Sequence, residues 1–234
     1  MGAVMTGLSR MGAFTALCGV SLCFCLLLPA LSLARGAALP QAQGVVAHNF
    51  DGDTLKLTDR RVVRLAGIDT PEMGGKDALP QYYARESRAL LAQLTKGQKV
   101  ILHAAGESRK DRYGRITAEV LLEDGQSLNE IMLSEGAAFF YPHKEQDQEL
   151  QERLLALQQK AISERRGMWA HVLSQPVALQ TYMGNRNSLR FFPSDCAEAQ
   201  NIKPRNRVYF GTLMDAFLAG YAPARVCPFW PEQK

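Results

Sequence analysis

The sequence predicts an α+β, mainly β protein: a five-stranded barrel with three helices, followed by a small C-terminal α+β module. Three observations lead to this prediction. Short apolar segments bounded by turn residues recur between residues 44 and 122, which is typical of strands. Longer segments carry apolar residues at helical spacing. From about residue 181 the composition becomes rich in aromatic residues, arginine and asparagine, which marks a second unit.

The strands are expected where four to seven apolar-rich residues stand between turns. The Asp51-Gly52 pair after the first segment is strong hairpin chemistry. With 47% hydrophobic residues among 234, the chain can bury one good core and form a second small unit. The five strands are predicted at residues 44–50, 54–58, 62–68, 99–105 and 116–122.

Three segments are predicted as helices by their apolar spacing and their end signals. Ser127 and Glu130 form a capping box at the start of the second helix. Gly97, Gly136 and Gly167 stand where the helices end. One helix inserted between strands and two after them favour a closed or partly open Greek-key barrel of the oligonucleotide-binding (OB) type, with a swollen sandwich as the competing arrangement. The helices are expected within residues 80–97, 127–136 and 147–167.

The first 34 residues differ from the rest, because Arg10 is their only charged residue and residues 11–33 are almost wholly apolar. Small residues at Ser32 and Ala34 fit a cleaved signal peptide. The apolar run is also long enough to span a bilayer as a retained anchor, although Pro29 interrupts it. In both cases we expect the remainder to be secreted or periplasmic, with a membrane contact only if the segment is retained. The expected division is signal peptide or anchor 1–34, linker 35–43, barrel domain 44–172, linker 173–182 and C-terminal module 183–234.

Cysteine usage fits the same compartment. Three of the five cysteines lie in the apolar leader, so its removal leaves Cys196 and Cys227. Two cysteines in an exported domain predict a disulfide rather than two free thiols. The formal net charge of +4 becomes +3 without Arg10, and this mild basicity permits a polyanionic partner without requiring one.

The stretch from Asp51 to Glu72 places four carboxylates and an arginine among predicted strands and turns, although strand propensity disfavours aspartate. Asp53 and Asp69, at neighbouring strand ends, suit a hard divalent cation such as calcium, which takes carboxylate and carbonyl oxygens. The proline after Thr70 fixes the turn and aims the Thr70 carbonyl. The stretch therefore predicts a metal site.

The same region offers acid–base and phosphate-binding groups. Glu72 is placed to act as a base toward a water beside the metal. Arg64 and Arg115 supply planar forks that match phosphate oxygens and stabilise charge on a phosphoryl group. Each residue alone has a plain structural explanation, as part of a hairpin turn, as a surface acid or as a strand residue that extends along the surface. Their occurrence together predicts a phosphodiester hydrolase.

Tyr113 and Tyr141 are candidates for substrate binding, because aromatic faces stack on the bases of single-stranded nucleic acid. Partial burial in the core is the alternative explanation for both, since tyrosine is commonly half buried. The sequence leaves both explanations open.

Three pieces of sequence, "DGDT" (51–54), "RLAGIDTPE" (64–72) and "DRYGR" (111–115), resemble the signature of the staphylococcal nuclease (thermonuclease) family in order and spacing. Residues 44–172 resemble the secreted form of this SNase-like family. The resemblance implies a calcium-dependent endonuclease that hydrolyses DNA and RNA with low sequence specificity, leaves 3'-phosphate ends and needs no obligate protein partner. The alternative is a non-catalytic SNase-like module that binds nucleic acid or protein. Carried over position by position, the implied roles are calcium ligands at Asp53, Asp69 and the Thr70 carbonyl, phosphate binding by Arg64 and Arg115, and acid–base work or water positioning by Glu72.

The C-terminal piece resembles the small zinc-binding module of bacterial Ada-type alkylation-repair proteins, through a cysteine after an aromatic strand, "NRVYF", a helix and "AGY". The closing Pro-Cys-x-x-Cys pattern reads "PARVC" (223–227) here and lacks its first thiolate. Two cysteines without a histidine in this piece cannot form a four-coordinate zinc site. We therefore expect a degenerate module in which a Cys196–Cys227 disulfide replaces the metal. Its basic balance allows an accessory nucleic-acid contact, and a purely structural role is the alternative.

Overall fold

The computed structural model describes residues 42–74, 78–107, 109–227 and 230–231. The predicted signal peptide or anchor lies outside this part of the chain, as does most of the linker that follows it. Within the described part, no helix has the length and apolar character needed to cross a membrane.

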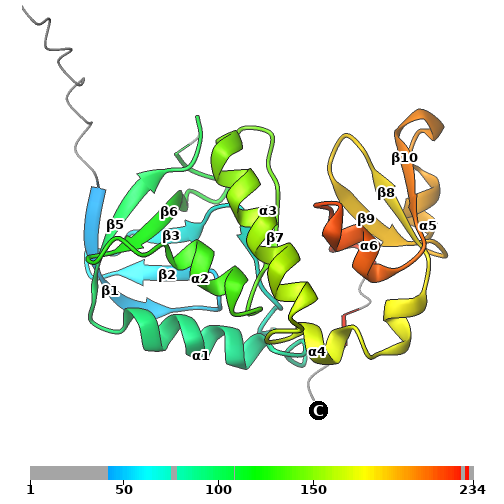
Figure 1. Ribbon diagram of the computed structural model, residues 1–234. Helices are drawn as coiled ribbons and strands as arrows, with labels where there is room; N and C mark the ends of the chain where they lie inside the picture. The colour runs from blue at the N-terminus through cyan, green and yellow to red at the C-terminus, as the bar shows by residue number, and fades with distance from the viewer. Residues whose placement is uncertain (1–41, 75–77, 108, 228–229, 232–234) are drawn as a thin grey trace, which may run out of the picture. The chain divides into compact units, whose positions relative to one another are not determined.

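Five strands form a closed barrel in the order β1-β2-β3-β6-β5 (Figure 1). All neighbouring pairs are antiparallel except β3 and β6, which run parallel. Side chains such as Leu55, Val63 and Val120 are fully buried, as expected for barrel strands with one face turned inward. The predicted fold class is confirmed. The barrel strands are β1 (Ala42–Asn49), β2 (Thr54–Leu57), β3 (Val62–Leu65), β5 (Lys99–Ala104) and β6 (Ile116–Leu122).

The three predicted helices are present as α1 (Ala84–Thr95), α2 (Leu128–Ser134) and α3 (Gln148–Ser163). The Ser127 side chain caps α2 by accepting from the Glu130 N–H, and Asp147 caps α3 in the same way. A further short helix, α4 (Trp169–Val172), follows α3.

The third predicted strand is wrong in its extent. The chain bends after β3, where Gly67 has a φ of 72° and a side chain would meet Leu154 at 2.5 Å. The residues beyond the bend form β4 (Ile68–Asp69), which pairs with β7 (Phe139–Phe140) outside the barrel. This bend turns Asp69 out of the barrel wall.

The C-terminal module has its own four-stranded sheet in the order β10-β8-β9-β11. Tyr182 and Phe191 belong to its strands and are fully buried together with Phe217, against which the Phe191 ring packs. The predicted linker is partly ordered structure, because a 3₁₀ helix, η1 (Pro176–Leu179), lies within it and β8 begins at its last residue. The remaining elements are β8 (Tyr182–Asn185), β9 (Arg190–Pro193), α5 (Ala197–Gln200), η2 (Pro204–Asn206), β10 (Arg207–Phe210), α6 (Leu213–Leu218) and β11 (Ala222–Pro223).

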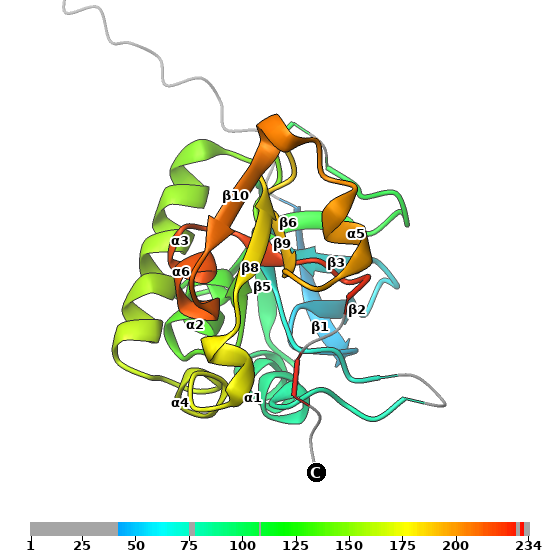
Figure 2. The ribbon, with the colours of Figure 1, turned by 90° about the vertical axis from the view of Figure 1, so that its right-hand side faces the viewer.

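The module is joined to the barrel domain through α3, which packs against α2 and against α6 (Figures 1 and 2). Gln158, fully buried on α3, accepts from the Phe140 N–H at 2.7 Å and donates to the Phe217 carbonyl at 2.8 Å. Trp169 packs edge-to-face on Phe217 in the same core. The described residues of barrel and module thus belong to one compact unit.

Candidate active site

The Asp51–Asp53 turn is fixed against α1. The Asp53 N–H donates to the Asp51 side chain at 3.0 Å, which closes the turn locally. A side chain at Gly52 would meet Ser87 at 2.7 Å and Thr70 at 2.9 Å. Glycine is therefore required by the close approach of the turn to its neighbours, and this approach sets the position of Asp53.

The Asp53 carboxylate is buried and accepts several hydrogen bonds. Thr54 donates its hydroxyl to one oxygen at 2.8 Å. Thr70 donates its N–H at 3.1 Å and its hydroxyl at 3.2 Å to the other oxygen. The predicted ligands Asp53 and Thr70 thus lie side by side, although 17 residues separate them in the chain.

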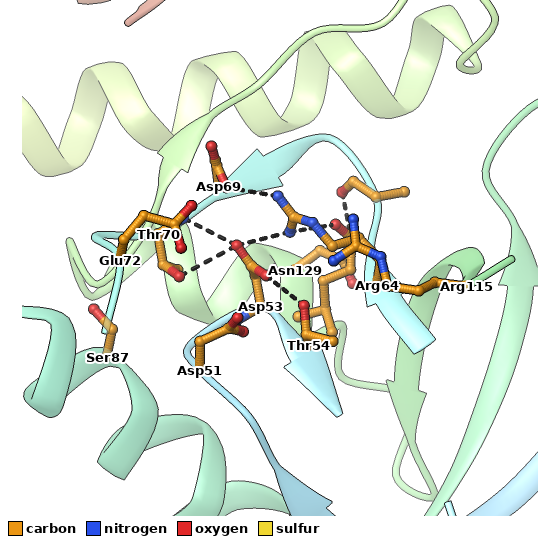
Figure 3. A network of polar contacts seen from close by, with 12 residues as sticks. Asp51, Asp53, Thr54, Arg64, Asp69, Thr70, Glu72, Ser87, Arg115 and Asn129 are labelled. Carbon is orange, nitrogen blue, oxygen red and sulfur yellow. Dashed lines mark hydrogen bonds and ion pairs between the residues drawn. The ribbon is translucent and has the colours of Figure 1, made fainter. Parts of the chain in front are cut away.

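Arg64 lies between two buried carboxylates (Figure 3). Its Nη1 is 2.8 Å from Asp53 and its Nη2 is 2.7 Å from Asp69. Burial raises the pKa of Asp53 to about 6, and Arg64 opposes that rise. Burial also raises the pKa of Asp69, again against Arg64. The guanidinium of Arg64 beside both acids, and that of Arg225 beside Asp69, therefore do not fully offset the desolvation of the two carboxylates.

This arrangement fits a hard divalent cation. Two buried carboxylates with raised pKa values gain from a further positive charge, and their oxygens are the donors that calcium takes. The acids do not form a three-carboxylate cluster. In the described part of the chain, the one group of three or more His, Cys, Asp or Glu ligand atoms within 4.8 Å of one another is Cys196, Glu198 and Cys227, in the C-terminal module.

Glu72 stands at the edge of the site beside Thr70 (Figure 3). Its side chain is 52% exposed, but its backbone is held at both polar groups. The Glu72 N–H donates to the Gln81 side chain at 2.8 Å, and the Gln81 N–H donates to the Glu72 carbonyl at 2.9 Å. These two bonds join Glu72 to Gln81 and limit where the Glu72 carboxylate can reach.

Arg115 lies on the same face of the barrel wall as Arg64. In the parallel pair of β3 and β6, Arg64 stands opposite Thr117. Arg115 stands directly before Ile116, where β6 begins, and Figure 3 shows its guanidinium on the side of β6 where Arg64 lies. Its guanidinium binds Asp111 at 2.7 Å instead of the carboxylates of Asp53 and Asp69. The ion pair with Asp111 thus holds the Arg115 side chain at the edge of the site.

The two candidate tyrosines differ in how much of each side chain is exposed to solvent. Tyr113 is 67% exposed and lies 5.3 Å from the Arg115 guanidinium, so core packing does not explain it. Tyr141 is half-buried, and the guanidinium of Arg190 lies 3.6 Å from its ring centre. Arg190 also donates to the Pro142 carbonyl at 3.1 Å, which secures the module against this ring.

Two site residues carry no signal in the sequence. Arg225, from the C-terminal module, places its Nη2 at 3.0 and 2.9 Å from the two oxygens of Asp69 and at 3.3 Å from Glu72. Asn129 is fully buried and ties α2 to the barrel by donating to the Ala66 carbonyl at 2.7 Å. Arg225 is 156 residues from Asp69, and Asn129 is 63 residues from Ala66, so no local pattern points to either contact.

Cys227 of the predicted cysteine pair lines one pocket together with the predicted site residues Asp69, Thr70 and Glu72. Cys196 and Cys227 are joined by a disulfide. A pocket of about 140 Å³ lies between the barrel mouth and the segment that contains Cys227. The lining residues are Asp69, Thr70, Glu72, Gln81, Phe139, Pro223, Ala224, Arg225, Cys227 and Trp230.

Comparison with known proteins agrees with this geometry. Residues 62–171 match the model of the family described as staphylococcal nuclease homologue. An uncharacterized endonuclease of Escherichia coli is 34% identical over 130 residues, which cover 54% of this chain and 76% of that protein. Endonuclease YhcR of Bacillus subtilis is 25% identical over 222 residues, 83% of this chain but 18% of its own length. The family match ends before the C-terminal module, so the Ada-type resemblance stays a prediction. The barrel, the matched residues and the first of these relatives together show that the chain belongs to the staphylococcal nuclease homologue family.

Proposed function

We propose that the protein is a calcium-dependent endonuclease that hydrolyses phosphodiester bonds of DNA and RNA with low sequence specificity. The observation that carries this proposal is the buried Asp53–Arg64–Asp69 group, with Glu72 beside it and Arg115 on the same barrel face. The names of the related endonucleases support a nuclease function. The alternative, a non-catalytic binding module, does not require this set of acids and arginines.

Asp53, Asp69 and the Thr70 carbonyl would hold the calcium ion. When bound, the ion supplies positive charge that draws electrons from a phosphoryl oxygen. Binding of the phosphate and transfer of the proton would depend on the side chains of the protein. Arg64 is placed by two ion pairs, and the remaining N–H groups of its planar guanidinium are suited to the oxygens of the scissile phosphate. Arg115, directly before β6, would stabilise the charge that develops on the phosphoryl group.

Glu72 would act on the proton of the attacking water. A water that attacks phosphorus must lose a proton, and the Glu72 carboxylate accepts it or holds the water for attack. The bond from phosphorus to the 5'-oxygen breaks, the 5'-oxygen takes a proton from solvent water and leaves as a hydroxyl, and a 3'-phosphate end remains. These groups would contact phosphate and water rather than base edges. They would therefore not distinguish one base sequence from another. Exposed Tyr113 adds a stacking surface that accepts any base.

The leader supports export, and we propose a secreted or periplasmic location. A retained membrane anchor is the second possibility, with the same catalytic domain outside the cytoplasm. The two differ in whether residues 11–33 remain attached. N-terminal sequencing of the protein isolated from its host distinguishes them.

Cleavage of supercoiled plasmid DNA and of a single-stranded RNA tests the proposed function. The purified protein should degrade both in calcium and neither in excess chelator. The Glu72→Gln variant is the matched control, because it keeps the side-chain shape and removes the proton acceptor. Intact plasmid after prolonged incubation in calcium would instead favour the binding module.

A further inference from the structure

The described C-terminal residues 222–227 and 230–231 lie beside the site and are held on both sides of Arg225. On one side, β11 pairs with β9, and the Ala224 N–H donates to the Phe191 carbonyl at 2.8 Å. On the other side, the disulfide joins Cys227 to Cys196. We call the described residues 222–227 and 230–231 the C-terminal strap.

The strap is also attached to the barrel domain near its end. The Tyr82 N–H donates to the Pro231 carbonyl at 2.7 Å, and the Trp230 indole N–H donates to the Tyr82 carbonyl at 3.0 Å. The Trp230 ring lies 5.6 Å from the ring of Phe139. These contacts place the strap alongside the pocket that contains Asp69 and Glu72.

From this position, the Arg225 guanidinium donates to both oxygens of Asp69. One of these oxygens also binds Arg64 at 2.7 Å, so each oxygen of this carboxylate already faces at least one guanidinium nitrogen. The two partners differ in burial. The Asp69 side chain is 6% exposed, whereas the Arg225 side chain is 59% exposed. Arg225 can therefore turn into solvent without breaking the core, but Asp69 cannot move away.

We propose that Arg225 competes with the divalent cation for Asp69, so that the strap restrains loading of the site. The proposal rests on the calcium site of the proposed function. Arg64 contacts Oδ1 of Asp69, whereas Oδ2 is contacted by Arg225 at 2.9 Å. A cation bound to Oδ2 at about 2.3 to 2.6 Å would therefore lie close to the Arg225 guanidinium nitrogen. Like charges at such a separation repel strongly in a partly buried site. Binding of calcium therefore requires Arg225 to leave Asp69, and loss of Arg225 favours calcium.

The restraint extends to Glu72. Arg225 lies 3.3 Å from its carboxylate, so the same guanidinium contacts the predicted metal ligand and the predicted proton acceptor. When Arg225 leaves, both carboxylates become available together. Cation binding and release of Glu72 are thus coupled through one side chain.

Calcium titration by calorimetry tests the competition, with the oxidised, purified protein and three variants. Arg225→Gln should bind calcium about ten-fold more tightly than wild type, which corresponds to about 1.4 kcal/mol. Arg205→Gln is the matched control, because it removes one positive charge from an exposed position of the same module, and its affinity should stay within about two-fold of wild type. Arg225→Lys, which keeps the charge without the planar fork, should fall between wild type and Arg225→Gln. Thermal unfolding of each variant checks that the fold is retained.

Equal or weaker calcium affinity in Arg225→Gln overturns the inference. A raised KM for nucleic acid without a change in calcium affinity also overturns it, because Arg225 would then be a substrate-binding residue. Plasmid cleavage in the same samples separates this outcome from failure of the proposed function. Cleavage with equal affinities refutes only the competition, whereas absence of both calcium binding and cleavage refutes both proposals.

Discussion

Arg64 and Arg225 donate to the same carboxylate from two different regions of the molecule. Arg64 belongs to strand β3 of the barrel, and its side chain is 10% exposed. Arg225 belongs to the C-terminal strap, and its side chain is 59% exposed. Both lie within 3.0 Å of an Asp69 oxygen. The chemistry of the two contacts is therefore alike, and their surroundings differ.

The difference in burial separates a fixed partner from a displaceable one. Arg64 offsets the charge of two buried acids, and removal of a buried partner leaves uncompensated charge in a dry site. Arg225 is in contact with solvent, which screens its ion pair and hydrates it after release. Arg64 thus belongs to the permanent site, and Arg225 sets how readily the site is filled. The following predictions test that distinction.

The largest effect is expected for Arg64→Ala. Cleavage should fall by about a thousand-fold or more, because a transition-state contact to phosphate is lost. The free energy of unfolding should fall by about 3 to 5 kcal/mol, because Asp53 and Asp69 lose their shared partner. Urea unfolding and plasmid cleavage measure the two effects. Arg61→Ala, which removes a surface pair with Asp59, should change stability by less than about 1 kcal/mol. Equal stability of the two variants would remove the basis for treating Arg64 as a fixed partner.

Glu72→Gln should impair catalysis without impairing the fold. The Glu72 side chain is 52% exposed, and its backbone bonds to Gln81 do not involve the carboxylate. We expect cleavage to fall by about a thousand-fold as the proton acceptor is lost, with the unfolding free energy within about 0.5 kcal/mol of wild type. The exposed Glu123→Gln is the matched control and should cleave normally. Wild-type rates in Glu72→Gln would exclude Glu72 from the reaction.

Loss of the disulfide should weaken the strap more than it weakens the barrel. The bond closes a loop with a sequence separation of 31 residues, and replacement of Cys196 and Cys227 by serine should cost about 3 to 4 kcal/mol in the chain-entropy model. Urea unfolding should show this decrease, and cleavage at saturating calcium should persist because the barrel site is intact. Dithiothreitol should reproduce the decrease in wild type and leave the double variant unchanged. An undiminished unfolding midpoint would show that the strap does not depend on this tether.

Much of the barrel could be predicted because its signals are local. The capping serine of α2 and the end glycines lie within a few residues of the features they mark. The Asp51–Asp53 turn and the residues around Asp69 also stand in short motifs, so their roles could be proposed before their contacts were known. The third strand was predicted to end at residue 68, three residues too late, because a single glycine in an apolar run does not reveal whether the chain bends there. Gly67 adopts a positive φ, and Leu154 of α3 leaves no room for a side chain beside it.

The contribution of the module to the site could not be predicted. Arg225 and Asp69 are 156 residues apart, and Arg225 stands in a sequence whose resemblance points only to an incomplete zinc motif. The contact exists because β11 pairs with β9 and directs the strap toward the barrel mouth. Such a placement depends on tertiary packing, for which one sequence carries no local signature. Asn129 was missed for the same reason, since its partners belong to β6 and to the end of β3.

The smallest effects are expected for substitution of the two tyrosines. Tyr113 is exposed to solvent, whereas Tyr141 is covered by Arg190 of the module. Tyr113→Leu should raise KM for single-stranded substrates about ten-fold with little change in kcat, because an exposed stacking surface is lost. Tyr141→Leu should raise KM less, since its ring already contacts Arg190 of the module at 3.6 Å, and it should lower the melting temperature instead. Steady-state cleavage of a short oligonucleotide gives both constants. A larger rise in KM for Tyr141→Leu would place the substrate on the module side and make the strap part of the binding surface.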